Sequence, residues 1–166
     1  MLPLTFYALR LAAVLFLTAA IGLVVQPQTA LAFGSSSNES SPSVSELIDQ
    51  AEAHIDKWEY TEAVDLLEQA LDEDANNPDV LNYLGYCHRK LGEPDTALEY
   101  YLAALAEEPD HLGANEYLGE LYLEMEQLDK AEERLAVLAD SCNSDCEEYN
   151  ELNQAIADYK EMHGIS

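Results

Sequence analysis

The chain has 166 residues, of which 33 are acidic and 7 are basic, so its formal net charge is −26 at pH 7. A surface this negative repels nucleic acid and anionic lipid headgroups and favours basic proteins or cations as partners. The same charge is also expected of a protein that only has to stay soluble. The sequence has no Gly-rich phosphate-binding loop, no His-Glu-x-x-His motif and no Gly-x-Ser-x-Gly motif, which argues against an enzyme.

The first 32 residues have the pattern of a secretory signal peptide. One basic residue, Arg10, precedes an apolar run over residues 11–25, and Ala30-Leu31-Ala32 fits the small-x-small site of signal peptidase. We therefore expect cleavage after Ala32, export to the bacterial periplasm and no stable membrane insertion of the mature protein. The alternative is a retained N-terminal anchor, for which the apolar run is short. Cleavage would remove one charged residue, Arg10, so the mature chain would carry one negative charge more.

Residues 33–43 are rich in serine and contain few apolar side chains. A segment of this composition cannot bury enough apolar surface to order itself, so we expect a flexible tether. It would connect the processing site to the folded part of the chain, and we assign no other function to it.

A 34-residue period organises the next hundred residues. Ala63, Ala97 and Ala131 stand 34 residues apart, and Leu84-Gly85 returns as Leu118-Gly119. A fixed period of this length indicates stacked pairs of helices, because one pair cannot bury its apolar face alone. We expect the recurring glycines and alanines to let paired helices approach closely. The period defines three units, over residues 44–77, 78–111 and 112–145.

The pattern within each unit resembles the tetratricopeptide repeat. The second unit reads Leu81-x2-Leu84-Gly85-x2-His88, Ala97-x3-Tyr101 and then Pro109; the third reads Asn115-x2-Leu118-Gly119-x2-Tyr122 and then Ala131-x3-Leu135. The first unit is the most degenerate. The resemblance covers residues 44–145. It implies an all-α fold, a right-handed α-solenoid of three helix pairs, followed here by a capping helix over residues 146–162.

The resemblance also implies a concave groove, lined by the first helix of each pair, that binds a segment of another protein. The candidate groove residues are Glu52 and Asp56 in the first unit, Asn82, Tyr86, Arg89 and Lys90 in the second, and Glu116, Glu120 and Glu124 in the third. Their spacing of four places the last three glutamates on one stripe of a helix. This stripe is either a binding surface for a basic segment or a solvated face.

One subclass of the family does not fit. Repeats that hold the acidic C-termini of heat-shock chaperones share a clamp of lysines, arginines and asparagines. The corresponding inner positions of this chain are occupied by Ile48, Glu52, Tyr83, Gly113 and Tyr117. A ligand that ends in a carboxylate would meet the wrong charge, so we do not expect one.

Two histidines and one cysteine fall within the predicted helices. His54 and His88 occupy the same position in successive units. Their helices should lie on the order of 10 Å or more apart, too far to share a metal ion. We therefore expect each to bridge the two helices of its own unit, and we predict no metal site and no cofactor. Cys87 is expected to be a small, buried apolar side chain.

Cys142 and Cys146 flank the turn before the predicted capping helix. In an oxidising compartment such a pair is expected to form a disulfide. The alternatives are a redox-active pair and part of a soft-metal site. Ser144 followed three residues later by Glu147 is a capping-box pattern, which predicts that the helix begins near Asp145.

These observations predict a non-catalytic, exported adaptor or assembly scaffold that holds a basic segment of another protein in its concave groove. The expected partner is a protein or peptide, and nucleic acid is not expected. The alternative is a periplasmic protein that handles cations or metals, or a thiol-redox accessory protein. In that case the acidic stripes and the Cys142/Cys146 pair would be the functional groups.

Overall fold

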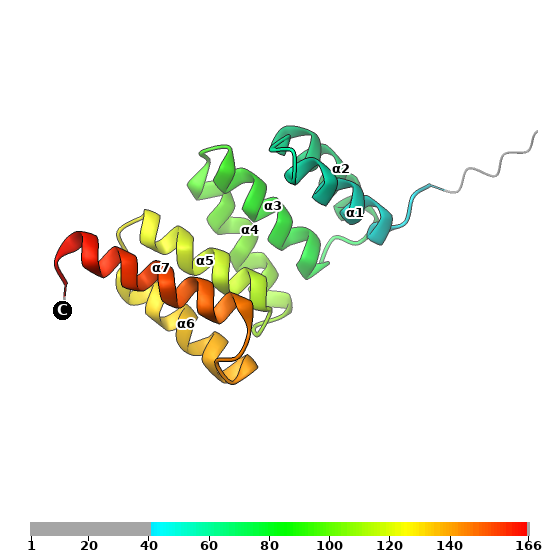
Figure 1. Cartoon of the computed structure of the whole chain (residues 1–166). Helices are drawn as coiled ribbons and strands as arrows, with labels where there is room; N and C mark the ends of the chain where they lie inside the picture. The colour runs from blue at the N-terminus through cyan, green and yellow to red at the C-terminus, as the bar shows by residue number, and fades with distance from the viewer. Residues whose placement is uncertain (1–40, 166) are drawn as a thin grey trace, which may run out of the picture. The chain divides into compact units, whose positions relative to one another are not determined.

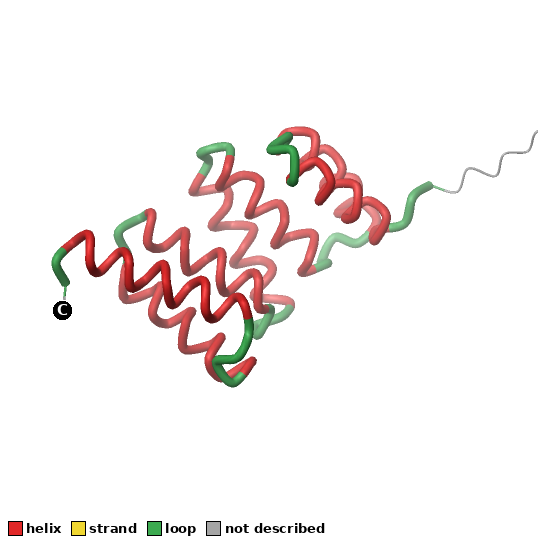
Figure 2. The backbone as a smooth tube through the Cα atoms, in the orientation of Figure 1, coloured by secondary structure: helices red, strands yellow, loops and turns green. Residues whose placement is uncertain are grey.

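The computed structural model of this protein describes residues 41–165, and these residues form helices and connecting turns without strands. The helices are α1 (Val44–Ile55), α2 (Tyr60–Glu73), α3 (Pro78–Lys90), α4 (Pro94–Glu107), α5 (Leu112–Glu124), α6 (Leu128–Cys142) and α7 (Glu147–His163) (Figures 1 and 2). The predicted signal peptide and most of the predicted tether lie outside the described residues. Between residues 41 and 165, no helix is both long enough and apolar enough to cross a membrane.

The helices form three hairpins, α1 with α2, α3 with α4 and α5 with α6, and successive hairpins pack against each other. Figure 1 shows α3, α5 and α7 running side by side. The prediction of an all-α solenoid of three helix pairs and a C-terminal helix is confirmed.

Local sequence explains where the helices begin and turn. Ser43 and Glu46 form a reciprocal capping box at the start of α1. Asn77 caps α3, whose first residue is a proline with no N–H to satisfy. Between the two helices of each hairpin one residue has a left-handed backbone, and these residues, Trp58, Gly92 and Glu126, again stand 34 positions apart.

The core repeats with the same period. Ala63, Ala97 and Ala131 are fully buried where the two helices of each hairpin meet. Gly85 is required by a close contact, because a Cβ atom at this position would lie 2.6 Å from two ring carbons of the buried Tyr101. The predicted role of the small residues in helix approach therefore holds for the second hairpin.

The third hairpin uses its glycine differently. A Cβ atom on Gly119 would lie 2.5 Å from a methyl carbon of Leu152, which belongs to α7 and not to the partner helix α6. Leu152 is fully buried and stands 34 residues after Leu118. Helix α7 packs against both α5 and α6. It thus continues the series as the first helix of an incomplete fourth unit, a relation that the sequence analysis missed.

The prediction of a capping box before α7 is wrong. The helix begins at Glu147, and its N-cap is Cys146, which makes no side-chain hydrogen bond to the helix. Asn143 and Ser144 both have left-handed backbones, with φ of 54° and 58°, so Ser144 lies in the turn rather than at the helix end. The helix extends to His163, one residue beyond the predicted end.

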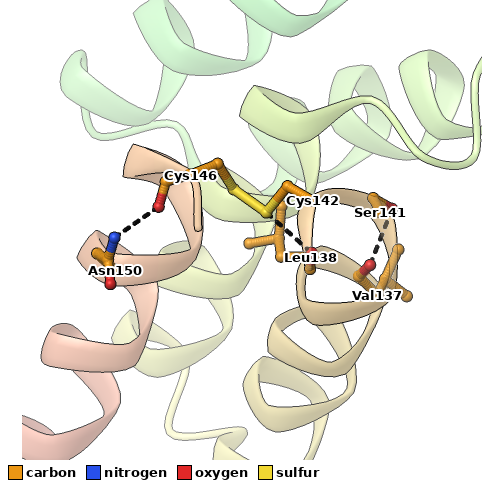
Figure 3. Close-up of a disulfide and its surroundings, with 6 residues drawn as sticks. All are labelled: Val137, Leu138, Ser141, Cys142, Cys146 and Asn150. Carbon is orange, nitrogen blue, oxygen red and sulfur yellow. Dashed lines mark hydrogen bonds between the residues drawn. A yellow bond between two sulfur atoms is a disulfide. The ribbon is translucent and has the colours of Figure 1, made fainter. Parts of the chain in front are cut away.

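Cys142 and Cys146 are joined by a disulfide between the last residue of α6 and the N-cap of α7 (Figure 3). Their Cα atoms are 5.9 Å apart. The side chain of Asn150 donates a 2.8 Å hydrogen bond to the carbonyl oxygen of Cys146, which secures the first turn of α7 next to the bond. The disulfide therefore links the terminal helix directly to the last hairpin.

Cys87 and the two histidines lie where the sequence predicts. Cys87 is fully buried in the core around the first hairpin, and burial raises the pKa of its thiol to about 12. His54 contacts Glu59 at 2.8 Å and His88 contacts Glu93 at 2.6 Å, both through Nδ1. Because these two glutamates are the N-caps of α2 and α4, each histidine does bridge the helices of its own hairpin.

The glycine contact yields a first prediction. We expect Gly85→Ala to lower stability by about 1–3 kcal/mol, because the added methyl group would overlap the ring of Tyr101, which is fully buried. Thermal unfolding followed by circular dichroism measures the effect. The matched control is Asn153→Ala, at the equivalent position of α7, where the side chain is exposed and no helix packs. A Gly85→Ala protein that melts at the wild-type temperature would contradict the packing described here.

The disulfide yields a second prediction. Closing a loop this short should stabilise the protein by about 2 kcal/mol, so reduction should lower the melting temperature by a few degrees. Alkylation and mass spectrometry of the unfolded protein, produced in an oxidising compartment, should detect one free thiol, that of Cys87. The Cys142→Ser/Cys146→Ser double variant should melt like the reduced protein and should not respond to reductant. Three free thiols in the protein from that compartment would refute the predicted bond.

Candidate functional site

The helices α1, α3, α5 and α7 share one side of the array, which we call the inner face. Its contacts recur at a separation of 31 residues, from the third turn of one helix to the second turn of the next. Tyr83 donates a hydrogen bond to Glu52, and the rings of Tyr86 and Tyr117 lie 5.0 Å apart between centroids. At the same positions of α5 and α7 stand two carboxylates, Glu120 and Glu151, which line one groove.

Arg89 forms an ion-pair network in the middle of the inner face. Its side chain is only 4% exposed, and its guanidinium nitrogens lie 2.6 Å from Glu120 and 3.4 Å from Glu124. The guanidinium carbon also lies 5.9 Å from the ring centroid of Tyr86 and 5.8 Å from that of Tyr117. Three predicted site residues are therefore brought together, but they bind each other. Arg89 is not free to receive an anionic ligand.

A cluster of tyrosines surrounds this network. Tyr83, Tyr86 and Tyr117 are half-buried, and the ammonium of Lys90 lies 5.0 Å from the ring centroid of Tyr86. Burial, and for Tyr83 the hydrogen bond to Glu52, raises the pKa values of Tyr83 and Tyr117, so both hydroxyls stay protonated. Such rings offer apolar area together with a polar hydroxyl. The sequence analysis placed Tyr83 and Tyr117 on inner positions but did not select them as contacts.

Asn82 is a buried residue of the inner face. It is 5% exposed, and its side-chain oxygen has no hydrogen-bond partner. A Cβ atom on Gly113 would lie 3.1 Å from its side-chain nitrogen, so the glycine leaves the space that Asn82 occupies against α5. Asn82 therefore sits below the surface of the face that the sequence predicted it would line.

Glu116 differs most from expectation. The predicted stripe of Glu116, Glu120 and Glu124 is an accessible surface only in part, because Glu116 is 3% exposed. Burial beneath α7, the hydrogen bond with Glu151 and the negative charges of Glu151 and Glu120 together raise the pKa of its carboxyl group to about 9. Its Oε1 atom has no hydrogen-bond partner. At neutral pH Glu116 is therefore protonated and adds no charge to the inner face.

An open acidic groove of about 660 Å³ runs between α5 and α7. Its lining residues are Glu120, Glu147, Asn150, Glu151, Gln154, Ala155 and Asp158. Four of these seven side chains are carboxylates and none is basic. The terminal helix thus contributes most of the negative charge here, although the sequence analysis treated it only as a cap.

The opposite end of the inner face is formed by α1. Glu52 is half-buried and accepts the hydrogen bond of Tyr83, whereas Asp56 is exposed at the end of α1. Among residues 41–165, no three or more His, Cys, Asp or Glu side chains form a group that could hold a metal ion.

Several solved structures share this fold. The tetratricopeptide domain of Sgt2 from Aspergillus fumigatus is 21% identical with a TM-score of 0.65, over 73% of this chain and 79% of that chain. The type III secretion translocator chaperone SycD of Yersinia enterocolitica is 19% identical with a TM-score of 0.63, over 76% and 95%. The first tetratricopeptide domain of Spaghetti (RPAP3), bound to the HSP90 peptide SRMEEVD, is 18% identical with a TM-score of 0.62, over 72% and 94%.

At these identities the likeness shows the fold alone. No curated protein matches the sequence significantly. Two family models do match, over residues 48–111 and 88–156, and both describe the tetratricopeptide repeat. The second match extends into α7, in agreement with the 34-residue relation between Leu118 and Leu152. Together the two matches cover most of the repeat array and part of α7, and the chain belongs to the tetratricopeptide repeat family.

Proposed function

We propose that this protein is a non-catalytic, exported adaptor or assembly scaffold, and that it binds a basic segment of another protein on its inner face. The observation that carries the proposal is the acidic groove between α5 and α7, whose lining includes Glu147, Glu151 and Asp158 and no basic side chain. None of these three carboxylates forms an ion pair within residues 41–165. They are therefore available to a cationic partner.

The structural neighbours support the general activity. The Spaghetti domain is bound to a peptide, and SycD is a chaperone of translocators. The peptide SRMEEVD ends in three acidic residues among its last four, whereas the inner positions of this chain include Glu52, Glu120 and Glu124. A ligand of the opposite charge is therefore the one that this inner face suits.

The remaining surface of the groove suits a peptide better than a small molecule. It is open to solvent, and the same inner face carries the half-buried rings of Tyr117, Tyr86 and Tyr83. Aromatic rings bind apolar and cationic side chains alike, at a low cost in conformational entropy. A segment with alternating basic and apolar residues could use both parts of the face.

A third prediction tests the charge of the ligand. Of the predicted stripe, Glu116 is buried and the other two glutamates bind Arg89, so the free carboxylates of α7 give the cleaner variant. We expect Glu147→Gln/Glu151→Gln/Asp158→Asn to weaken the binding of fluorescently labelled hexalysine by tenfold or more, about 1.4 kcal/mol. Fluorescence anisotropy measures the affinity. Wild-type affinity should also fall with added salt, because exposed charges are screened beyond about 8–10 Å.

The control for this experiment changes the same number of charges elsewhere. Asp65→Asn/Glu68→Gln/Asp72→Asn alters three exposed acids of α2, away from the inner face, and should bind hexalysine nearly as the wild type does. Labelled hexaglutamate should not bind either protein. Equal loss of affinity in the two triple variants would mean that net charge alone attracts the peptide. That result would contradict the proposal that the groove between α5 and α7 binds it.

A fourth prediction concerns export. If residues 1–32 form a cleaved signal peptide, the intact mass of the protein recovered from the periplasm should correspond to a chain that begins at Phe33. Ala30→Leu/Ala32→Leu should block processing, because signal peptidase requires small side chains at both positions. Recovery of the unprocessed wild-type chain in the membrane fraction would instead support a retained anchor.

A further inference from the structure

The contact between α5 and α7 breaks the pattern that joins the other inner helices. Helices α1 and α3 pair Glu52 with Tyr83, and α3 and α5 pack the ring of Tyr86 against that of Tyr117 at a tilt of 51°. At the equivalent positions of α5 and α7, by contrast, Glu120 and Glu151 line the same groove. The first two contacts are attractive, whereas two carboxylates that line one groove repel each other. Arg89 satisfies Glu120 from one side, and Glu151 has no basic partner among the described residues.

Glu116 lies next to these two carboxylates. Its side chain is only 3% exposed, and its carboxyl group is hydrogen-bonded to Glu151, one of the residues that line the groove. Its Oε1 atom has no partner. A buried polar atom without a partner is unfavourable, so a hydrogen-bond donor that reaches Oε1 would stabilise the site.

The charged groups that raise the pKa of Glu116 are all carboxylates. Glu148 and Glu151 face it from α7, and Glu120 faces it from α5 itself. The nearest guanidinium on α3, that of Arg89, binds Glu120 and Glu124, and Arg134 of α6 donates to Asn115 instead. Without a cation in the groove, a proton on Glu116 is the available means of reducing this repulsion.

We infer that the groove between α5 and α7 is the anchor for a lysine or arginine side chain of the partner, and that this cation takes the place of the proton on Glu116. The inference rests on the proposed function. The incoming ammonium or guanidinium donates to Glu116 and Glu151, and the carboxylic acid of Glu116 releases its proton to solvent. One positive charge replaces another, so the buried carboxylate is never left without compensation.

An organic cation fits the groove better than a metal ion does. Within residues 41–165 no group of three or more metal-ligating side chains is arranged around a common point. The groove is also open to solvent and has a volume of about 660 Å³, whereas an ion such as Ca²⁺ is held by ligands at about 2.3–2.6 Å. A long, flexible side chain can enter such a groove from a peptide that lies across its rim.

A fifth prediction follows from the proton count. At pH 7.5 hexalysine binding to the purified protein should release about one proton, which calorimetry detects as a difference in binding enthalpy between phosphate and Tris buffers of equal ionic strength. Between pH 6.5 and 8.5 the affinity should rise about tenfold per pH unit, since one proton competes with the ligand. In Glu116→Gln both effects should vanish. Glu147→Gln, on the rim of the same groove, should keep both.

A second measurement needs no ligand. The native state holds the Glu116 proton up to about pH 9, whereas the unfolded chain loses it near the ordinary glutamate value of about 4.3. Stability from this group is therefore complete below that value and declines as the pH rises toward 9. Glu116→Gln should raise the melting temperature at pH 8.5 more than at pH 5, and Glu147→Gln should not.

The outcomes separate the two proposals. Hexalysine that binds, responds to the α7 triple variant and releases no proton would overturn the anchor and leave the proposed function standing. If hexalysine binds neither on the inner face nor in the groove, both the proposed function and the anchor are overturned. Calcium chloride that binds alone with the same proton release would overturn the assignment to an organic cation. Proton release that is lost in Glu116→Gln and kept in Glu147→Gln would support the anchor.

Discussion

Close contact between helices at Gly85 and Gly119 is the constraint on which the rest of the structure depends. With no Cβ atom at these positions, Tyr101 and Leu152 can fill the space against the helix backbone. The inner helices therefore stack with a constant offset, and residues 31 positions apart meet on the inner face. The chemistry of that face follows from this offset, because each helix presents the same two positions to its neighbour.

The acidic residues of the chain have different effects on the outer helices and on the inner face. Carboxylates on the outer helices are solvated and screened, so each one changes stability little. On the inner face, packing brings carboxylates close together, and their negative charge is reduced in two ways. Arg89 forms ion pairs with Glu120 and Glu124, which offsets one of their two negative charges, and Glu116 keeps its proton. Both responses remove negative charge from the centre of the array and leave it concentrated along α7.

The repeat period was sufficient to predict the hairpins, the buried alanines, the bridging histidines and Cys87, because these depend on contacts within one unit or between adjacent units in strict register. The candidate site was predicted less well. A spacing of four places Glu116, Glu120 and Glu124 on one stripe, but it does not say which helix covers that stripe. Helix α7 covers Glu116, and its own register was hidden because Asn153 replaces the glycine of Gly85 and Gly119. That position needs no small residue where no further helix packs.

The disulfide acquires a functional meaning from this arrangement. It joins the end of α6 to the start of α7, and α7 supplies Glu147, Glu151 and Asp158 to the groove as well as the cover over Glu116. The repulsion among these carboxylates pushes α7 away from α5, whereas Leu152 and the covalent link hold it in place. Loss of the disulfide would weaken the attachment of α7 to the last hairpin. Formation of the disulfide would therefore complete the acidic groove as well as stabilise the end of the array.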